Sequence, residues 1–198
     1  MTSEEECIID HVVGLLGKQV ILRGDGVFEC SLDAEHLLNY LTTLRDDPKL
    51  RLKVLTDVFA VDYHNRRPRF EVVYMLLSLA KNIRLCCKVA VVEGESLPTV
   101  SSVFSSSVWF EREVYDMYGI EFSNHPDLRR ILTDYGFTGH PMLKDFPLTG
   151  YEEVQYDFRK GKVTYQPVNL QQNFRRFNSM SPWKGSSPES QHEPKDQN

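Results

Sequence analysis

The chain has 198 residues, of which 41% are apolar, and this length suits one globular domain with extensions. Its formal net charge of −5, with acidic and basic residues interspersed, argues against nucleic-acid binding through charge alone. No apolar run reaches the roughly 18–20 residues that cross a bilayer, and the acidic start resembles neither a secretory signal nor an Arg-rich transit peptide, so we expect any membrane association to come through partners.

The first part of the chain predicts two amphipathic helices with a pair of short strands between them. Apolar residues recur at helical spacing over residues 3–16. Residues 19–30 then read as two short strands around an Arg-Gly-Asp-Gly turn. A second helix is predicted from about Asp33, its expected N-cap, to about Arg45, where Asp-Asp-Pro ends it.

Three longer strands are predicted next, at about 52–63, 69–79 and 83–92. The third alternates clearly between apolar and polar residues, which is typical of a half-buried antiparallel sheet. Because neighbouring residues of a strand point to opposite faces, Cys87 is predicted to lie in the core and Cys86 to point outward.

Two helical stretches complete the predicted domain. Leu97-Pro98 is expected to open the first, with Val100 and Phe104 among its buried positions. Ser107 is expected to cap the second, which ends at Gly119. Residues 1–119 are therefore predicted to form an α+β domain, a mostly antiparallel sheet with helices on one face.

The character of the chain changes after Gly119, because seven of the 10 prolines lie beyond it. One hairpin is plausible there, at about 153–158 and 162–166. An aromatic-rich segment with little periodicity cannot easily bury its own rings, so residues 120–183 are predicted to form a long extended arm laid on another protein. Residues 184–198 have the composition of a disordered tail.

The cysteines and histidines do not predict a metal or catalytic site. The four cysteines form no C-x-x-C pair, and adjacent Cys86 and Cys87 cannot easily share a metal, so reduced thiols are expected. His125 and His140 each precede proline, and nearby aspartates are not at a recognisable ligand spacing, so both are interpreted as turn-forming, hydrogen-bonding residues. Nucleotide-binding and hydrolase motifs are also missing from the sequence.

A cluster of charged residues and turn formers stands out in residues 111–132: Glu111, Arg112, Glu113, Asp116, Gly119, His125, Arg129 and Arg130. Arg112 and Asp116 are four residues apart on a helix and can pair. The three consecutive charges at 111–113 point to different sides, so at most one or two serve this chain's own surface. The plain alternative is a solvated charged helix. Gly119 is expected to end the helix in a left-handed conformation.

This cluster resembles the signature of the thirty-kilodalton (C) subunit of respiratory complex I, the proton-pumping NADH:quinone oxidoreductase. Residues 129–157 resemble the same family, and the resemblance spans roughly residues 20–183. It marks as signature or interface residues the eight just named together with Asp145, Phe146 and Tyr151. It favours a structural ion-pair role at or near a subunit interface, and it favours interface packing over a quinone pocket for the aromatic residues Phe137, Phe146, Tyr151, Tyr156 and Tyr165.

The resemblance implies a non-catalytic core scaffold subunit of the peripheral arm of NADH:ubiquinone oxidoreductase. Such a chain packs on the large quinone-site subunit, binds no nucleic acid and meets the membrane only through partners. It holds no cofactor, while the assembled H+-translocating enzyme is expected to hold FMN and iron–sulfur clusters. The implied location is the cytoplasmic face of a bacterial inner membrane or the matrix face of the mitochondrial inner membrane.

Three alternatives stay open. Membrane-bound nickel–iron hydrogenases carry related subunits, and the segment DYGFTGHP…DFPLTGY favours the NADH–quinone branch over them. A free-standing module could bind RNA or an acidic partner through its arginines Arg129, Arg130, Arg175 and Arg176. The net negative charge of the chain argues against this alternative. A hydrolase built on His125 lacks a placed nucleophile.

Overall fold

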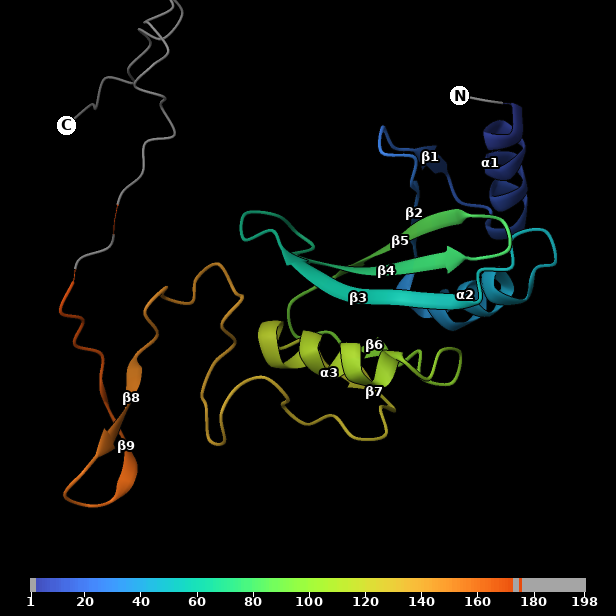
Figure 1. The fold of residues 1–198 in the computed structure, drawn as a ribbon. Helices are drawn as coiled ribbons and strands as arrows, with labels where there is room; N and C mark the ends of the chain where they lie inside the picture. Colours follow the sequence, from blue (N-terminus) through green and yellow to red (C-terminus); the bar gives the residue numbers. More distant parts are fainter. Residues whose placement is uncertain (1–2, 173–174, 176–198) are drawn as a thin grey trace, which may run out of the picture. The chain divides into compact units, whose positions relative to one another are not determined.

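The computed structural model describes residues 3–172 and 175, and the chain divides into two compact units between Gly150 and Tyr151 (Figure 1). The predicted disordered tail, 184–198, and the last part of the predicted arm lie outside the described residues.

The first unit is built on a five-stranded sheet. Its strands are β1 (Val20–Leu22), β2 (Phe28–Leu32), β3 (Val54–Asp62), β4 (Phe70–Ser78) and β5 (Ile83–Val91). Their order is β1-β2-β5-β4-β3. Every neighbouring pair is antiparallel except β2 and β5, which run parallel, so the predicted mostly antiparallel sheet is a mixed one.

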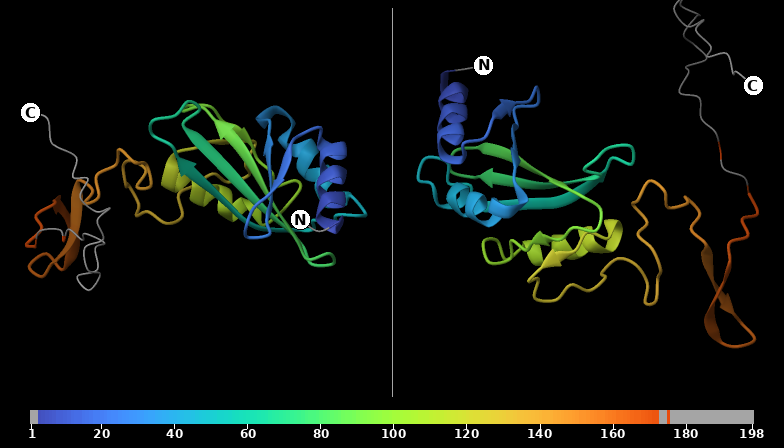
Figure 2. Two further views of the ribbon diagram at one scale, coloured as in Figure 1. Left: turned by 90° about the horizontal axis from the view of Figure 1, so that it is seen from above. Right: turned by 180° about the vertical axis from the view of Figure 1, so that it is seen from behind.

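Helices cover one face of this sheet. They are α1 (Ser3–Leu16), a 3₁₀ turn (Ala34–His36) that leads into α2 (Leu37–Asp46), and α3 (Ser107–Tyr118). Helices α2 and α3 lie on the same side of the sheet, and α1 stands at its end beside β1 (Figures 1 and 2). The core lies between helices and sheet, with Leu41 of α2 and Cys87 of β5 both fully buried, as predicted for Cys87. Asp33 takes the N-cap position, but its carboxylate contacts Lys18 and Tyr40 instead of capping.

The prediction that Cys86 points outward to solvent is wrong, because its side chain is only 2% exposed. It does face away from Cys87, as the alternation requires. However, β5 is an inner strand, and Cys86 lies in register between Glu29 of β2 and Met75 of β4. A small side chain between two longer ones is covered even on the face that carries no helix.

The helix predicted to open at Leu97-Pro98 is also wrong. These two residues form β6 (Leu97–Pro98), which pairs in parallel with β7 (Phe122–Ser123). The N–H of Leu97 donates to the Glu121 carbonyl at 2.9 Å, and the N–H of Thr99 donates to the Ser123 carbonyl at 3.0 Å. Val100 and Phe104 are buried, as predicted. A two-residue strand is too short to show an alternation of apolar and polar residues in the sequence. It is recognised only by its pairing with a segment more than twenty residues away.

The second unit contains the predicted hairpin. Its strands are β8 (Glu152–Asp157) and β9 (Lys162–Pro167), which pair antiparallel. Residues 120–150, which the sequence assigned to an arm, belong to the first unit. Apart from β7, they form turns and irregular backbone close to α3.

Candidate functional site

Helix α3 turns most of its charged residues inward. It begins at Ser107 and ends before Gly119, which has φ 75° and ψ 15°, the left-handed conformation that was predicted. Glu111, Arg112 and Asp116 are all buried, which charged residues rarely are unless they are paired. The alternative of a solvated charged helix is therefore wrong for these three residues, whereas Glu113 is exposed.

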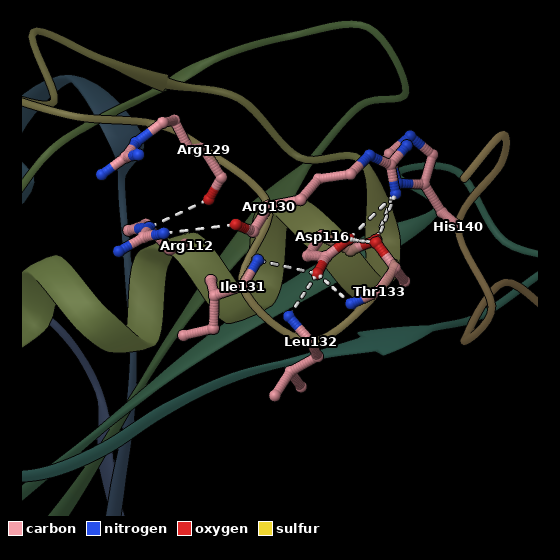
Figure 3. A network of polar contacts seen from close by, with 8 residues as sticks. All are labelled: Arg112, Asp116, Arg129, Arg130, Ile131, Leu132, Thr133 and His140. Atoms are coloured by element: carbon pink, nitrogen blue, oxygen red, sulfur yellow. Dashed lines mark hydrogen bonds and ion pairs between the residues drawn. The ribbon is translucent and has the colours of Figure 1, made fainter. Parts of the chain in front are cut away.

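The Asp116 carboxylate binds several groups of the loop that follows the helix (Figure 3). Its Oδ2 accepts hydrogen bonds from the backbone N–H groups of 131, 132 and 133 at 3.0, 2.7 and 2.9 Å. Its Oδ1 accepts from Arg130 Nη1 at 2.9 Å and from Thr133 Oγ1 at 2.7 Å. Burial opposes ionisation, but the hydrogen bonds from Thr133 and its neighbours outweigh it, so the pKa of the Asp116 carboxyl lies well below its usual value.

The Arg112 side chain binds backbone carbonyls of the same loop. Its guanidinium donates to the carbonyls of Arg129 at 2.9 Å and Arg130 at 3.2 Å (Figure 3). The predicted pairing of Arg112 with Asp116 is wrong, since no ion pair joins them within the described part of the chain. Both side chains instead reach across to residues 129–133, whose backbone N–H groups occupy Oδ2 of Asp116 and whose Arg130 and Thr133 side chains occupy Oδ1.

Glu111 ties the other end of α3 to the β6 segment. Its carboxylate accepts the backbone N–H of Val100 at 2.8 Å and the hydroxyl of Thr99. Its Oε2 lies 3.7 Å from the Nε2 of His125, and both side chains are fully buried. Burial raises the pKa of Glu111, and the hydrogen bonds only partly oppose this shift.

His125 and His140 act as hydrogen-bonding residues, as interpreted from the sequence. The His125 Nδ1 accepts the N–H of Asp127 at 3.1 Å, so the neutral ring carries its hydrogen on Nε2, which lies 3.2 Å from the Val108 carbonyl. The His140 Nδ1 lies 3.0 Å from the Asp116 carbonyl, which can only accept. Each ring therefore fixes a loop to α3.

The two arginines of the signature differ in exposure. Arg129 pairs with Asp127 at 2.7 Å on the surface. Arg130 pairs with the buried Asp116 and lies 5.9 Å from the centre of the Phe137 ring. Both charges thus have partners inside this chain.

A second network, which the sequence did not suggest, holds the far end of the loop. Arg69 donates to the buried Asp62 at 2.8 and 2.9 Å and to Asp145 at 3.0 Å, with Glu93 as a further partner. The N–H of Lys144 donates to Asp62 at 2.8 Å. The guanidinium of Arg69 lowers the pKa of the Asp62 carboxyl. Asp62 ends β3 and Arg69 precedes β4, so the positions of these two residues beside one turn could have suggested that they pair. The contact of Arg69 with Asp145 spans 76 residues, and no local pattern indicates it.

The remaining predicted residues lie beyond these two networks. Phe146 packs 6.0 Å from Phe137, centre to centre, inside the first unit. Tyr151 starts the second unit and is 68% exposed. The structure thus brings most of the signature residues together around α3, with Asp145 on the Arg69 network.

What this arrangement does is hold residues 120–150 against α3 and the sheet. Within the described residues, no group of three or more His, Cys, Asp or Glu side chains could hold a metal ion. A search of the same residues finds no helix with the length and apolarity to span a bilayer.

The sequence is similar to those of known respiratory-chain proteins. Residues 30–152 match the family described as "Respiratory-chain NADH dehydrogenase, 30 Kd subunit". A protein of Wolbachia sp. subsp. Brugia malayi, named as the C subunit of NADH-quinone oxidoreductase, is 55% identical over 169 residues, which are 85% of this chain and 89% of the relative. A Methylobacterium sp. protein of the same name is 48% identical over 187 residues, 93% of this chain and 87% of the relative.

Two solved structures share the fold. The trypsin-resistant fragment (1–134) of Nqo5 is 30% identical with a TM-score of 0.51, and the match covers 63% of this chain and 98% of the fragment. A chain of the archaeal membrane-bound sulfane sulfur reductase, at 20% identity, has a TM-score of 0.64 over 74% of this chain and 87% of its own length. The latter likeness concerns the fold alone.

Proposed function

The chain belongs to the family of the 30-kDa subunit of respiratory-chain NADH dehydrogenase, and we propose that it serves that enzyme as a non-catalytic scaffold that holds no cofactor. It is a subunit of NADH-quinone oxidoreductase, as its relatives are named. In the proposal, the assembled enzyme passes electrons from NADH through FMN and iron–sulfur clusters to a quinone, coupled to proton translocation.

The proposed partner is the large quinone-site subunit of the peripheral arm. The observation that carries this proposal is the second unit, in which large apolar side chains lie open: Tyr151, Val154, Tyr156, Phe158, Val163, Tyr165 and Leu170 are all at least 49% exposed. Exposed apolar side chains gathered in one segment mark interaction surfaces, and tyrosine and phenylalanine are enriched in them.

The predicted division into a domain at 1–119 and an arm at 120–183 becomes more specific in this proposal. Residues 120–150 anchor the arm through the Asp116 and Arg69 networks, and residues from 151 onward contact the partner. The trypsin-resistant Nqo5 fragment supports a first unit that folds by itself, because this chain covers 98% of that fragment.

We further propose a peripheral position on the cytoplasmic face of a bacterial inner membrane, or on the matrix face of the mitochondrial one. The relatives named above are bacterial subunits of a respiratory enzyme, which favours the first.

The test is purification of the tagged chain from its host in mild detergent, followed by cross-linking mass spectrometry and an NADH:quinone activity assay. We expect a large assembly that oxidises NADH with quinone, is blocked by quinone-site inhibitors, and shows cross-links from residues 151–172 to the large quinone-site subunit. Recovery of a monomer, or of an assembly without that subunit, would overturn the proposal.

A further inference from the structure

The hairpin of the second unit has two faces of opposite character. Residues alternate between the faces of a strand, and the register pairs Val154 with Tyr165 and Tyr156 with Val163. These four residues therefore share one side, the apolar hairpin face, which Glu152 and Pro167 border at the open end of the hairpin. The other side, the polar hairpin face, consists of Glu153, Gln155, Asp157, Lys162, Thr164 and Gln166.

The apolar hairpin face is exposed to water, whereas the polar hairpin face is a mixture: Gln155 and Lys162 are exposed, and Glu153, Asp157, Thr164 and Gln166 are half-buried. On the apolar hairpin face, the exposed fractions are 56% for Val154, 49% for Tyr156, 54% for Val163 and 53% for Tyr165. On the polar hairpin face, side chains form hydrogen bonds with side-chain and backbone groups of the hairpin itself. The Gln166 amide donates to Glu153 at 2.6 Å, and the Thr164 hydroxyl donates to the Gln155 carbonyl at 3.2 Å.

A two-stranded hairpin is marginally stable in water unless its apolar side is covered. Here the polar hairpin face already satisfies hydrogen bonds of its own, and the apolar one is the side that needs a cover. Covering these half-exposed Val and Tyr side chains with a partner would stabilise the complex by about 25 cal/mol for each Å² of apolar surface removed from water.

The tip of the hairpin adds a charge. Residues 157–162 carry three cations, Arg159, Lys160 and Lys162, against the single carboxylate of Asp157, which pairs with Lys160 at 3.5 Å. Arg159 and Lys162 are exposed, and neither forms an ion pair within the described residues. A complementary surface is therefore apolar under the strands and carries carboxylates near the tip.

We propose that the apolar hairpin face docks on an apolar patch of a neighbouring subunit of the oxidoreductase, with carboxylates of that subunit facing Arg159 and Lys162. The inference rests on the proposed function, which places this chain inside a multi-subunit enzyme. It adds which face is covered, which face stays in water, and what chemistry the receiving surface has.

In the experiment, a photoreactive amino acid replaces either residue 156, on the apolar hairpin face, or residue 155, on the polar hairpin face. The full-length chain is used, and it is irradiated in the assembled enzyme. We expect irradiation to cross-link position 156 to another subunit at least ten times more efficiently than position 155. Equal yields from both positions, no cross-link from either, or cross-links from 156 to this chain or to a second copy of it would overturn the proposal.

Substitutions give a second readout that does not need the photoreactive group. Tyr156→Glu should lower the fraction of chain incorporated into the enzyme at least tenfold, while Gln155→Glu should leave it unchanged. Arg159→Gln combined with Lys162→Gln should lower it several-fold. Equal incorporation of the Tyr156→Glu and Gln155→Glu chains would count against the proposal, and unchanged incorporation of the double variant would remove the carboxylate part.

Failure of this inference and failure of the proposed function give different results. If the enzyme assembles fully without residues 151–183, the proposed scaffold role of the arm is wrong. If assembly needs those residues but position 155 cross-links as well as position 156, only the face assignment is wrong.

Discussion

The imidazole ring of His140 fills the space directly over the α-carbon of Gly119. A β-carbon at position 119 would lie 2.7 Å from the ring carbon Cδ2. The ring is held there by its Nδ1, which lies 3.0 Å from the Asp116 carbonyl. The end of α3 and the loop at 140 are therefore fitted to each other at a position where the backbone already requires φ 75°.

Gly119→Ala is expected to lower the free energy of unfolding by about 2 kcal/mol. Roughly 1 kcal/mol comes from the left-handed backbone, and roughly 1 kcal/mol from displacing His140 and its hydrogen bond. Gly17→Ala is the matched control, because Gly17 also has positive φ but has open space around it, and only the backbone cost is expected.

A double-mutant cycle separates the two contributions by chemical denaturation. In a His140→Ala background, Gly119→Ala should cost no more than Gly17→Ala, since the ring is gone. An undiminished cost in that background would show that the ring does not press on Gly119.

Asp116→Asn should destabilise the first unit by about 3 kcal/mol, because an amide presents a donor where five donors converge, and a buried ion pair loses one partner. Hydrogen exchange of the amides of 131–133 should rise in parallel. Asp127→Asn removes a surface partner of Arg129 and is expected to change neither quantity measurably. Protection of 131–133 that survives Asp116→Asn would contradict the role given to Asp116.

The two buried carboxylates of α3 should respond to pH in opposite directions. The pKa of Asp116 is lowered from 3.8 by folding, so its contribution is present above about pH 4 and is lost as the pH falls further. The pKa of Glu111 is raised from 4.5 by burial, so the wild type loses stability as the pH rises above about 4.5 toward that raised pKa.

The measurement is the unfolding free energy of the wild type minus that of each variant, from about pH 3 to about pH 8, a range that includes the ordinary pKa values of both carboxyls in the unfolded chain. This difference should fall with rising pH for Glu111→Gln, and it should rise with pH for Asp116→Asn. Glu113→Gln, on the exposed side of the same helix, controls for removal of a surface charge. Slopes of the same sign for the two buried positions would refute the assignment.

Arg69→Ala should release the loop at 144–145 and destabilise the first unit by about 3 kcal/mol, because Asp62 is left buried without its cation. Hydrogen exchange should increase at residues 143–146 and not at 131–133, where Asp116 still holds the backbone. Glu93→Gln, which removes an exposed outer partner, is the control and should leave the exchange pattern unchanged.

Local patterns predicted the elements that depend on neighbours in sequence. The alternation at 83–92 placed β5 and the burial of Cys87, and the turn at Arg159-Lys-Gly-Lys placed the hairpin. The helix end at Gly119 followed from a glycine after an amphipathic run. Each of these signals lies within a window of a few residues.

The contacts of the buried charges could not be predicted in the same way. Asp116 and Arg112 were expected to pair at helical spacing, yet both bind groups 14 to 18 residues further on. Backbone acceptors and donors carry no sequence signal, so the partner of a charged side chain is visible only after the loop is placed. The same holds for Cys86, whose burial depends on the strands on either side of it.

The most direct test of the scaffold proposal is the incorporation of a chain that ends at Gly150, expressed in a host whose own copy is deleted. This cut keeps the partners of Asp116 in residues 130–133 and the contact of Arg69 with Asp145, whereas a cut at 119 would remove both. A chain lacking only residues 184–198 is the control. We expect the chain ending at Gly150 to unfold cooperatively near the full-length melting temperature, yet to be missing from the enzyme, with NADH:quinone activity lost. Co-migration of that chain with an active enzyme at the full-length level would contradict the proposal.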